Sequence, residues 1–256
     1  MPMKLLLKRK VLCAALLALA ALLAPRLEAA GPDAFEKANR LYTDGKFQEA
    51  KELYIQLSQE FKDDAAFLYN WGNSAYRLGQ SGEAILAFER ALKRDPRNAD
   101  IRANLNHARS GLEYKIEDKR NWYLKAAEEA LGYFRDQEIN LLAMAAYSLF
   151  MAACLTGLLF RRGLPWGPWR KASAWFFAFS LLLAGIKYCD TAYFKDAVIT
   201  SREAEVRYGP SVSDRTAFRL GEGLRAYQVD ARRGWRRIVL VNNEGGWIKD
   251  SDLQLV

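Results

Sequence analysis

The sequence contains few of the side chains that perform redox, nucleophilic or metal chemistry. Its 256 residues include one histidine, His107, and three cysteines. Cys13 and Cys154 fall inside apolar runs and Cys189 ends a third run, so no exported thiol is available as a nucleophile. A lone histidine supplies neither a catalytic triad nor a zinc site. Because no Gly-rich phosphate loop is present, the sequence indicates a binding protein rather than an enzyme, and we expect no metal or other cofactor.

The positive charge of the chain is not distributed like that of a nucleic-acid-binding protein. Lysine and arginine number 38 against 30 acidic residues, which gives a net charge of +8. Residues 31–135 contain equal numbers of both kinds and residues 196–256 are nearly balanced, so the excess falls in residues 1–30 and 136–195. A domain that neutralises phosphates would itself be basic. We therefore expect no nucleic-acid partner.

The first 30 residues have the layout of a secretory signal peptide. A basic stretch precedes an apolar core over residues 11–24, and small residues follow as far as Ala30. The residue three positions before the expected cleavage site is not small, so an uncleaved anchor remains the alternative. Both forms export the chain that follows.

Two further apolar runs, residues 139–160 and 172–189, are close to the roughly 20 residues that cross a bilayer as a helix. The loop between them, residues 161–171, has four basic residues and no acidic one, so the positive-inside rule places it in the cytoplasm. The regions before and after the two runs then both face outward, in agreement with the export signal. Residues 119–138 mix aromatic and charged side chains just before the first run and predict an interfacial helix, with a cap over the last helix of the preceding helical region as the alternative.

Residues 65–98 carry the pattern of two antiparallel helices in contact. Small residues recur where the helices must touch, at Gly72, Ala84 and Ala91. A shift back by about 34 residues places Ala38, Gly45 and Ala50 on Gly72, Gly79 and Ala84. A third copy begins near Ala99 and ends at Gly111. The pattern resembles the tetratricopeptide repeat (TPR) family, and predicts about two and a half repeats over residues 31–118 with a capping helix after Gly111.

The TPR resemblance implies a concave groove, lined by the first helix of each repeat, in which peptides bind. The groove residues carried over from the family pattern are Phe35, Asn39, Tyr42, Tyr69, Asn73, Tyr76, Arg77, Ala103 and His107. Asn39 and Asn73 stand where many TPR grooves hydrogen-bond a ligand backbone. Asp100 and Asn104 stand where the cations of a carboxylate clamp would be, so the resemblance does not imply capture of a free C-terminus.

Residues 196–256 contain short β-branched runs separated by glycine-rich turns, which predict a small all-β barrel. The segments that carry a resemblance to the bacterial SH3-like domain are 206–210, 220–223, 234–235 and 245–248. This resemblance implies binding of peptidoglycan or peptide. Trp235 and Trp247 are the candidate stacking residues, and packing in the core or rim of the barrel is their other interpretation.

The predicted fold is therefore a multidomain membrane protein, with an all-α TPR region, two transmembrane helices and an SH3-like barrel. This order of segments is similar to the BatE family, the TPR proteins of bacterial aerotolerance (Bat) operons. That resemblance implies partners among membrane-anchored von Willebrand factor A proteins and a MoxR-type ATPase, and a link to oxygen or stress tolerance.

Three functions are compatible with the sequence. The first is a scaffold of the bacterial inner membrane, whose periplasmic TPR groove binds another envelope protein. The second is a cell-wall tether, in which the SH3-like domain at residues 196–256 binds peptidoglycan. The third, an enzyme of envelope or cytochrome assembly, has the least support because the exported regions contain no thiol and no metal set.

Overall fold

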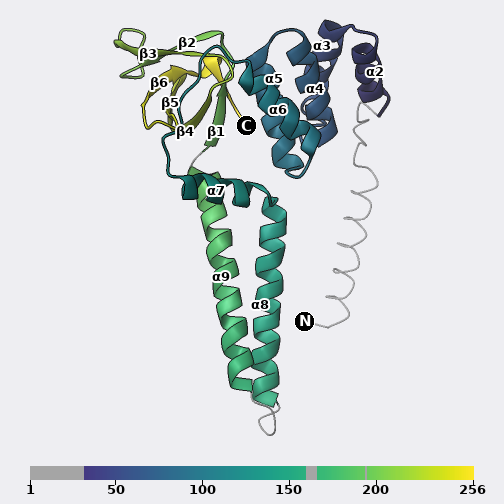
Figure 1. Cartoon of the computed structure of the whole chain (residues 1–256), viewed down its shortest axis with the longest axis vertical. Helices are drawn as coiled ribbons and strands as arrows, with labels where there is room; N and C mark the ends of the chain where they lie inside the picture. Colours follow the sequence, from purple (N-terminus) through teal and green to yellow (C-terminus); the bar gives the residue numbers. More distant parts are fainter. Residues whose placement is uncertain (1–31, 160–165, 194) are drawn as a thin grey trace, which may run out of the picture.

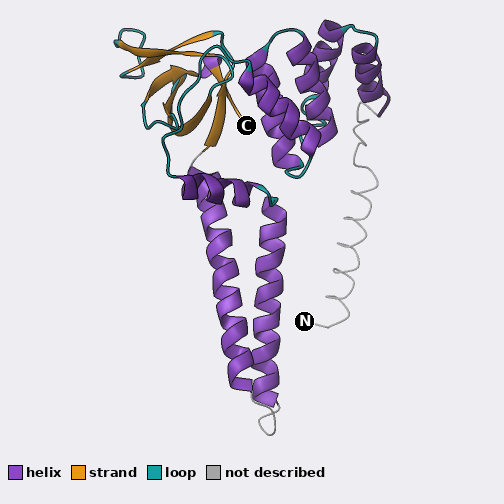
Figure 2. Cartoon of the chain, in the orientation of Figure 1, coloured by secondary structure: helices purple, strands orange, loops and turns teal. Residues whose placement is uncertain are grey.

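The structure, a computed structural model, describes residues 32–159, 166–193 and 195–256. The predicted signal peptide and the first half of the predicted cytoplasmic loop lie outside the described residues. Figure 1 shows a head of helices and strands above a stem of two long helices. The head has a helical half and a sheet half, which lie side by side (Figure 2).

Five helices form the helical half of the head, in two hairpins followed by a single helix. They are α2 (Pro32–Thr43), α3 (Phe47–Leu57), α4 (Ala65–Arg77), α5 (Ser81–Arg94) and α6 (Ala99–Ser110). Gly45 and Gly79 close the two hairpin turns with φ of 76° and 70°, a left-handed conformation that glycine adopts without strain. Asp64 and Asn98 accept hydrogen bonds from the first amides of α4 and α6, and so define where these helices begin.

The small residues of the repeat pattern lie where the helices touch. Ala38, Ala50, Ala84 and Ala91 are fully buried. A methyl group added to Gly72 would lie 2.6 Å from Cε1 of Phe88, so the close approach of α4 and α5 requires glycine there. The interpretation of these positions as helix contacts is confirmed.

The predicted capping helix after Gly111 is wrong. Residues 112–120, here called the strap, contain no helix and run across to the sheet. Leu112 and Ile116 pack against the core of the sheet, and Tyr114 lies against Gly221. These three side chains are spaced two residues apart, which puts them on one side of an extended chain. The segment therefore covers the sheet, and Leu112 at its start also packs against the buried cluster that contains Leu105 and Ala108 of α6.

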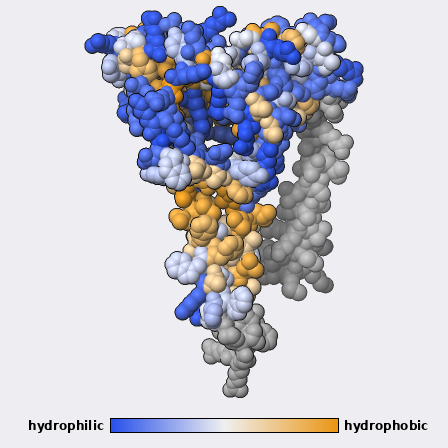
Figure 3. Space-filling model, viewed as in Figure 1, coloured by the Kyte–Doolittle hydropathy of each residue, from blue (hydrophilic) through white to orange (hydrophobic). Residues whose placement is uncertain are grey.

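The stem consists of α8 (Asp136–Leu159) and α9 (Trp166–Tyr193), and α7 (Trp122–Gly132) lies across its upper end (Figure 1). Each stem helix contains a window long and apolar enough to cross a membrane. Only 11% and 6% of these windows are buried in the molecule, whereas the core helix of a soluble protein would be mostly buried. Figure 3 shows the resulting apolar band below the polar head. The helix α8 begins before the first predicted span, α9 extends beyond the second predicted span at both ends, and α7 is shorter than the predicted segment 119–138.

Seven antiparallel strands form the sheet half of the head. They are β1 (Lys195–Ile199), β2 (Glu203–Arg207), β3 (Thr216–Gly221), β4 (Arg225–Arg232), β5 (Trp235–Val239), β6 (Gly245–Lys249) and β7 (Leu253–Leu255), with a short 3-10 turn, η1 (Asp250–Asp252), before β7. Their order is β3-β2-β6-β5-β4-β1-β7. Within the described residues no pairing joins β3 to β7, so the sheet is open where a closed barrel was predicted. Strap side chains, rather than another strand pairing, cover part of its core.

The helical half and the sheet half share an apolar core. Val198 of β1 belongs to the same buried cluster as Ile85 and Phe88 of α5. Arg90 of α5 donates two hydrogen bonds, of 2.6 and 3.2 Å, to the carbonyl oxygen of Leu255 in β7. The contacts of the sheet with the repeats thus fall mainly on α5, a second helix of a repeat.

Candidate functional site

Two asparagine pairs link the first helices of successive repeats. Asn70 donates its side-chain N–H to Oδ1 of Asn39, and Asn104 donates in the same way to Oδ1 of Asn73, each over 2.9 Å. Tyr54 adds a second donor to Asn39 at 2.6 Å. Burial raises the pKa of the Tyr54 phenol, so this donor stays protonated. The two pairs have the same spacing along the chain and form a polar ladder across α2, α4 and α6.

A pocket of about 190 Å³, here called the groove pocket, opens at the second pair of this ladder. Its lining residues come from α2, α4, α5 and α6, and are Tyr42, Asn73, Tyr76, Arg77, Phe88, Asn104 and His107. Small-molecule sites usually enclose about 300–1,000 Å³. The groove pocket therefore suits one or two side chains of a bound polypeptide better than a cofactor.

The asparagines of the groove pocket keep one donor and one acceptor for a ligand. Neither Nδ2 of Asn73 nor Oδ1 of Asn104 forms a hydrogen bond with any residue that the structure describes. Both side chains are half-buried, so a ligand that covered them would have to satisfy these groups. An extended polypeptide presents N–H and C=O groups side by side and meets this requirement.

Aromatic rings and the guanidinium of Arg77 lie around the amide pair. The rings of Tyr76 and His107 have their centres 5.5 Å apart, and those of Tyr42 and Phe47 are 5.3 Å apart. The guanidinium carbon of Arg77 lies 5.7 Å from the centre of the Phe47 ring. The groove pocket thus offers apolar surface, amide groups and positive charge within one or two helical turns.

The structure brings together only part of the predicted groove. Tyr42, Asn73, Tyr76, Arg77 and His107 line the groove pocket. Phe35 instead packs in the core against the rings of Tyr54, Phe61 and Phe67, because it lies on the side of α2 that faces α3 and α4. Two other predicted residues, Asn39 and Tyr69, are engaged in hydrogen bonds within the ladder, and Ala103 is exposed on α6.

Two lining residues were not among the predicted groove positions. The sequence pattern predicts Phe88 as a core residue of a second helix. Phe88 is buried, but it also lines the groove pocket. In the sequence, Asn104 stands where a carboxylate clamp would have a cation, and it was not predicted to line the groove. The signal that identifies Asn104 is its spacing from Asn73, which equals that of Asn70 from Asn39.

The two tryptophans of the sheet, which the predicted SH3-like domain would present at its surface, are buried. Trp235 and Trp247 are only 8% and 7% exposed. The guanidinium of Arg232 lies over the Trp247 ring, 5.0 Å from its centre. Neither indole has an open face for a sugar or peptide, and packing is the interpretation that fits.

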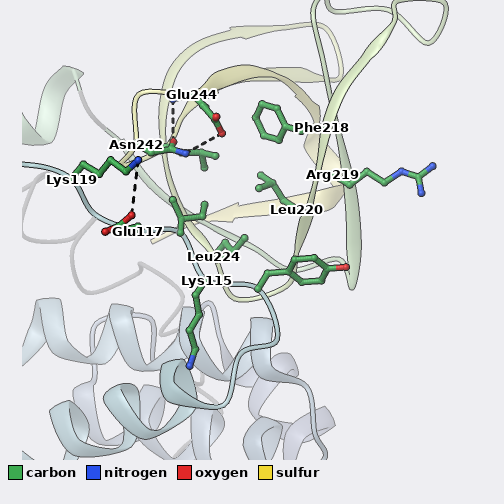
Figure 4. A pocket seen from close by; sticks show the side chains of 12 residues that line it. Lys115, Glu117, Lys119, Phe218, Arg219, Leu220, Leu224, Asn242 and Glu244 are labelled. Carbon is green, nitrogen blue, oxygen red and sulfur yellow. Dashed lines mark hydrogen bonds and ion pairs between the residues drawn. The ribbon is translucent and has the colours of Figure 1, made fainter.

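A second cavity, of about 330 Å³, lies between the strap and the sheet (Figure 4). Leu220 and Leu224 line it and belong to the core of the sheet. Of the polar side chains at its rim, Asn242 donates to Glu244 at 3.0 Å and Lys119 lies 4.0 Å from Glu117, whereas Lys115 and Arg219 point away from the cavity (Figure 4). Lacking convergent free polar groups, this cavity is a packing gap rather than a built site.

A chain of ion pairs joins the repeats, the sheet and α7. Asp196 of β1 accepts from Lys93 of α5 at 3.0 Å and from Arg225 of β4 at 2.8 Å. Arg225 also reaches Glu128 of α7 at 2.9 Å. Burial alone would raise the pKa of Asp196, but the charges of Arg225 and Lys93 outweigh burial and lower this pKa. The head is thereby attached to the segment that covers the stem.

Metal ions in proteins are bound by groups of histidine, cysteine and acidic side chains. No group of three or more histidine, cysteine or acidic side chains that could hold a metal ion occurs among residues 32–159, 166–193 and 195–256. The groove pocket is thus described by hydrogen bonding, apolar contact and charge.

Residues 35–99 match the tetratricopeptide repeat family. The predicted TPR is confirmed over this range, which contains α3, α4, α5 and most of α2. No curated protein matches the chain. Tetratricopeptide repeats are typically non-catalytic modules that bind other proteins, and α2, α4 and α5 of the matched range contribute to the groove pocket together with α6.

Proposed function

We propose that this protein is an adaptor of the bacterial inner membrane that holds a segment of another envelope protein in its TPR groove. One observation carries the proposal, which is the free donor of Asn73 beside the free acceptor of Asn104 in the groove pocket. A segment bound in extended form would pair its main chain with both groups and place side chains against Tyr76 and Phe88. The sheet supports this arrangement because it packs on α5 and leaves the groove pocket open.

In this proposal α8 and α9 cross the membrane, residues 161–171 face the cytoplasm, and the TPR region and SH3-like domain are periplasmic. The placement of both folded regions at the same end of the stem supports this topology (Figure 1). The exposed apolar surface of the stem supports it as well. Trp122, Tyr123 and Phe134, which are exposed around α7, then lie at the level of the lipid headgroups.

Lys187 supports the placement of α7 at the membrane surface. Its ammonium group donates to the carbonyl oxygens of Leu131 and Phe134, at 3.1 and 3.4 Å, and lies 3.4 Å from Asp136. The carbonyls at the end of a helix favour a cation. A lysine near the end of α9 thus reaches out of the apolar band and joins α7 to the stem.

The resemblance to the Bat-operon proteins makes membrane-anchored von Willebrand factor A proteins the first partners to consider, and oxygen or stress tolerance the first process. A cell-wall tether is less favoured. Its candidate stacking residues are Trp235 and Trp247, and both rings are buried. We therefore place the binding function in the groove pocket rather than on the sheet.

The test is affinity purification of the tagged full-length protein from detergent-solubilised membranes. The wild type should recover a partner that the variant Asn73→Ala with Tyr76→Ala does not recover. Gln48→Ala with Ile55→Ala is the matched control, because both residues are exposed on α3 and do not line the groove pocket. Equal recovery by all three proteins, at equal membrane levels, would remove the support for this function.

A further inference from the structure

Arg77 differs from every other arginine of residues 32–110, the part of the chain that holds helices α2 to α6. The others each donate to a carboxylate or a main-chain carbonyl, and they are Arg40, Arg90, Arg94, Arg97, Arg102 and Arg109. Arg77 lies over the Phe47 ring and has no acceptor among the residues that the structure describes. The contact with the aromatic ring orders the guanidinium, while the N–H donors of Arg77 stay free.

The groove pocket around Arg77 is positively charged and has no compensating acid. None of its seven lining residues is aspartate or glutamate. His107 faces Tyr76, and its ring nitrogens have no hydrogen-bond partner in the described chain. The other arginines of residues 32–110 each have an acceptor in the chain, so among them the missing acceptor is specific to this pocket. A bound carboxylate would supply the absent partner.

The spacing along the groove indicates where that carboxylate would come from. Arg77 and His107 follow Asn73 and Asn104 by about one turn on α4 and α6, a rise of roughly 5.4 Å. A peptide whose main chain pairs with the two asparagines can therefore reach Arg77 with an acidic side chain of the same segment. One guanidinium balances one carboxylate, whereas a doubly charged phosphate is usually held by a cluster of arginines.

We propose that the TPR groove selects partner segments that carry an aspartate or glutamate side chain, whose carboxylate binds the free guanidinium of Arg77 beside His107. This inference rests on the function proposed above and specifies the chemistry of the segment. Charge-assisted, bidentate hydrogen bonds from arginine are stronger than neutral ones and depend on geometry. Replacement of the acid by its amide should weaken binding at least about tenfold.

The experiment is a selection of random ten-residue peptides on the detergent-solubilised full-length protein. The peptides are displayed at the N-terminus of a phage coat protein and thus have no free C-terminus, so any acid selected is a side chain. Parallel selections use Arg77→Gln, the pocket variant Asn73→Ala with Tyr76→Ala, and Arg40→Gln. Arg40→Gln is the control because it removes the same charge from an exposed ion pair on α2.

The expected result is enrichment of aspartate or glutamate by the wild type and by Arg40→Gln, but not by Arg77→Gln. A selected peptide, synthesised with capped ends and labelled, should then bind the wild type at least about tenfold more tightly than its glutamine counterpart in fluorescence anisotropy. Arg77→Lys, which keeps the charge but not the fork, should fall between the wild type and Arg77→Gln. Equal melting temperatures of the arginine variants exclude loss of folding.

Two results would overturn the inference. One of them would leave the proposed peptide-binding function intact, and the other would contradict that function as well. Enriched peptides without acids that still depend on Asn73 and Tyr76 would show that the groove binds polypeptide without reading a carboxylate. No enrichment over the pocket variant would contradict both the acid preference and the proposed peptide-binding function.

Discussion

The amide of Gly82, at the start of α5, donates a hydrogen bond of 3.0 Å to Oε2 of Glu222, which lies 140 positions further along the chain. The N-cap residue of α5, Gln80, makes no side-chain cap bond of its own. The turn between β3 and β4 therefore caps a helix of the TPR region, and its carboxylate also favours the positive end of the helix. The repeats and the sheet are expected to fold as one unit.

Gly82→Ala should destabilise this unit. A methyl group at Gly82 would lie 2.8 Å from the carbonyl oxygen of Ile199, so the helix and the sheet would have to separate. The expected loss is about 1–3 kcal/mol of unfolding free energy, measured by chemical denaturation of the detergent-solubilised protein. Gly132→Ala on α7 has open space around it and is the control, expected to change stability by less than about 1 kcal/mol. Equal stability of both variants would show that the close contact does not matter.

Asp196 should make the head sensitive to acid. Its pKa is lower in the folded than in the unfolded chain, because Arg225 and Lys93 stabilise the carboxylate more than burial opposes it. The stabilisation is then complete above the unfolded pKa of about 3.9 and is lost as the pH falls through the lower folded pKa. Asp196→Asn should cost about 1–3 kcal/mol at pH 7 and flatten the decline in stability below pH about 4.

The control for this prediction is Asp63→Asn. Asp63 pairs with Arg94 at the surface, where an ion pair contributes about 0–1 kcal/mol. Its substitution should leave both the stability at pH 7 and the acid profile close to those of the wild type. An unchanged acid profile in Asp196→Asn would contradict the role of the ion-pair chain.

Lys187→Met should loosen α7 from the stem. The substitution removes the donor to the carbonyls of Leu131 and Phe134 without adding bulk. Hydrogen exchange of the amides of α7 should rise by about tenfold, equivalent to about 1.4 kcal/mol of local stability. Lys171→Met, nearer the opposite end of α9, should leave that exchange rate unchanged. Protection of α7 equal to the wild type would mean that the lysine does not hold this helix.

Cysteine labelling should distinguish the two ends of the stem. In a background without the native cysteines, Ser58→Cys on the helical half and Ser251→Cys on the sheet half should react with a membrane-impermeant maleimide in intact spheroplasts. Gly163→Cys in the loop should react only after the membrane is permeabilised, because the basic loop is expected in the cytoplasm. Labelling of the loop position in intact spheroplasts would refute the proposed orientation.

The repeats could be predicted residue by residue because their determinants are local. Gly72 and Ala84 mark the contact of helices that are neighbours in the chain, and Gly79 marks the turn between them. The same holds for five of the groove residues, whose positions follow from the helical repeat. Phe35 was misplaced because its face depends on Phe61 and Phe67, which lie outside its own helix.

The strap and the tryptophans of the sheet show where such local information ends. Residues 112–120 could have continued the helical stack, and their path to the sheet depends on the apolar core of the sheet, against which Leu112 and Ile116 pack. The sequence pattern of a tryptophan after a glycine turn is the same for a ring that faces solvent and for a ring in the interior. It therefore does not predict whether Trp235 is buried. The burial of both rings is set by which strands pair and which side chains, such as Arg232, cover them.

The sequence by itself determined the helical repeats and the two apolar helices, because helix periodicity and long apolar runs are properties of contiguous residues. Only the tertiary structure decided that Glu222 caps α5, that Lys187 meets the end of α7, and that Arg77 is left without an acceptor in the groove pocket. Each of these depends on which groups distant in the chain come within a few ångströms, a relation that arises when whole elements pack against one another.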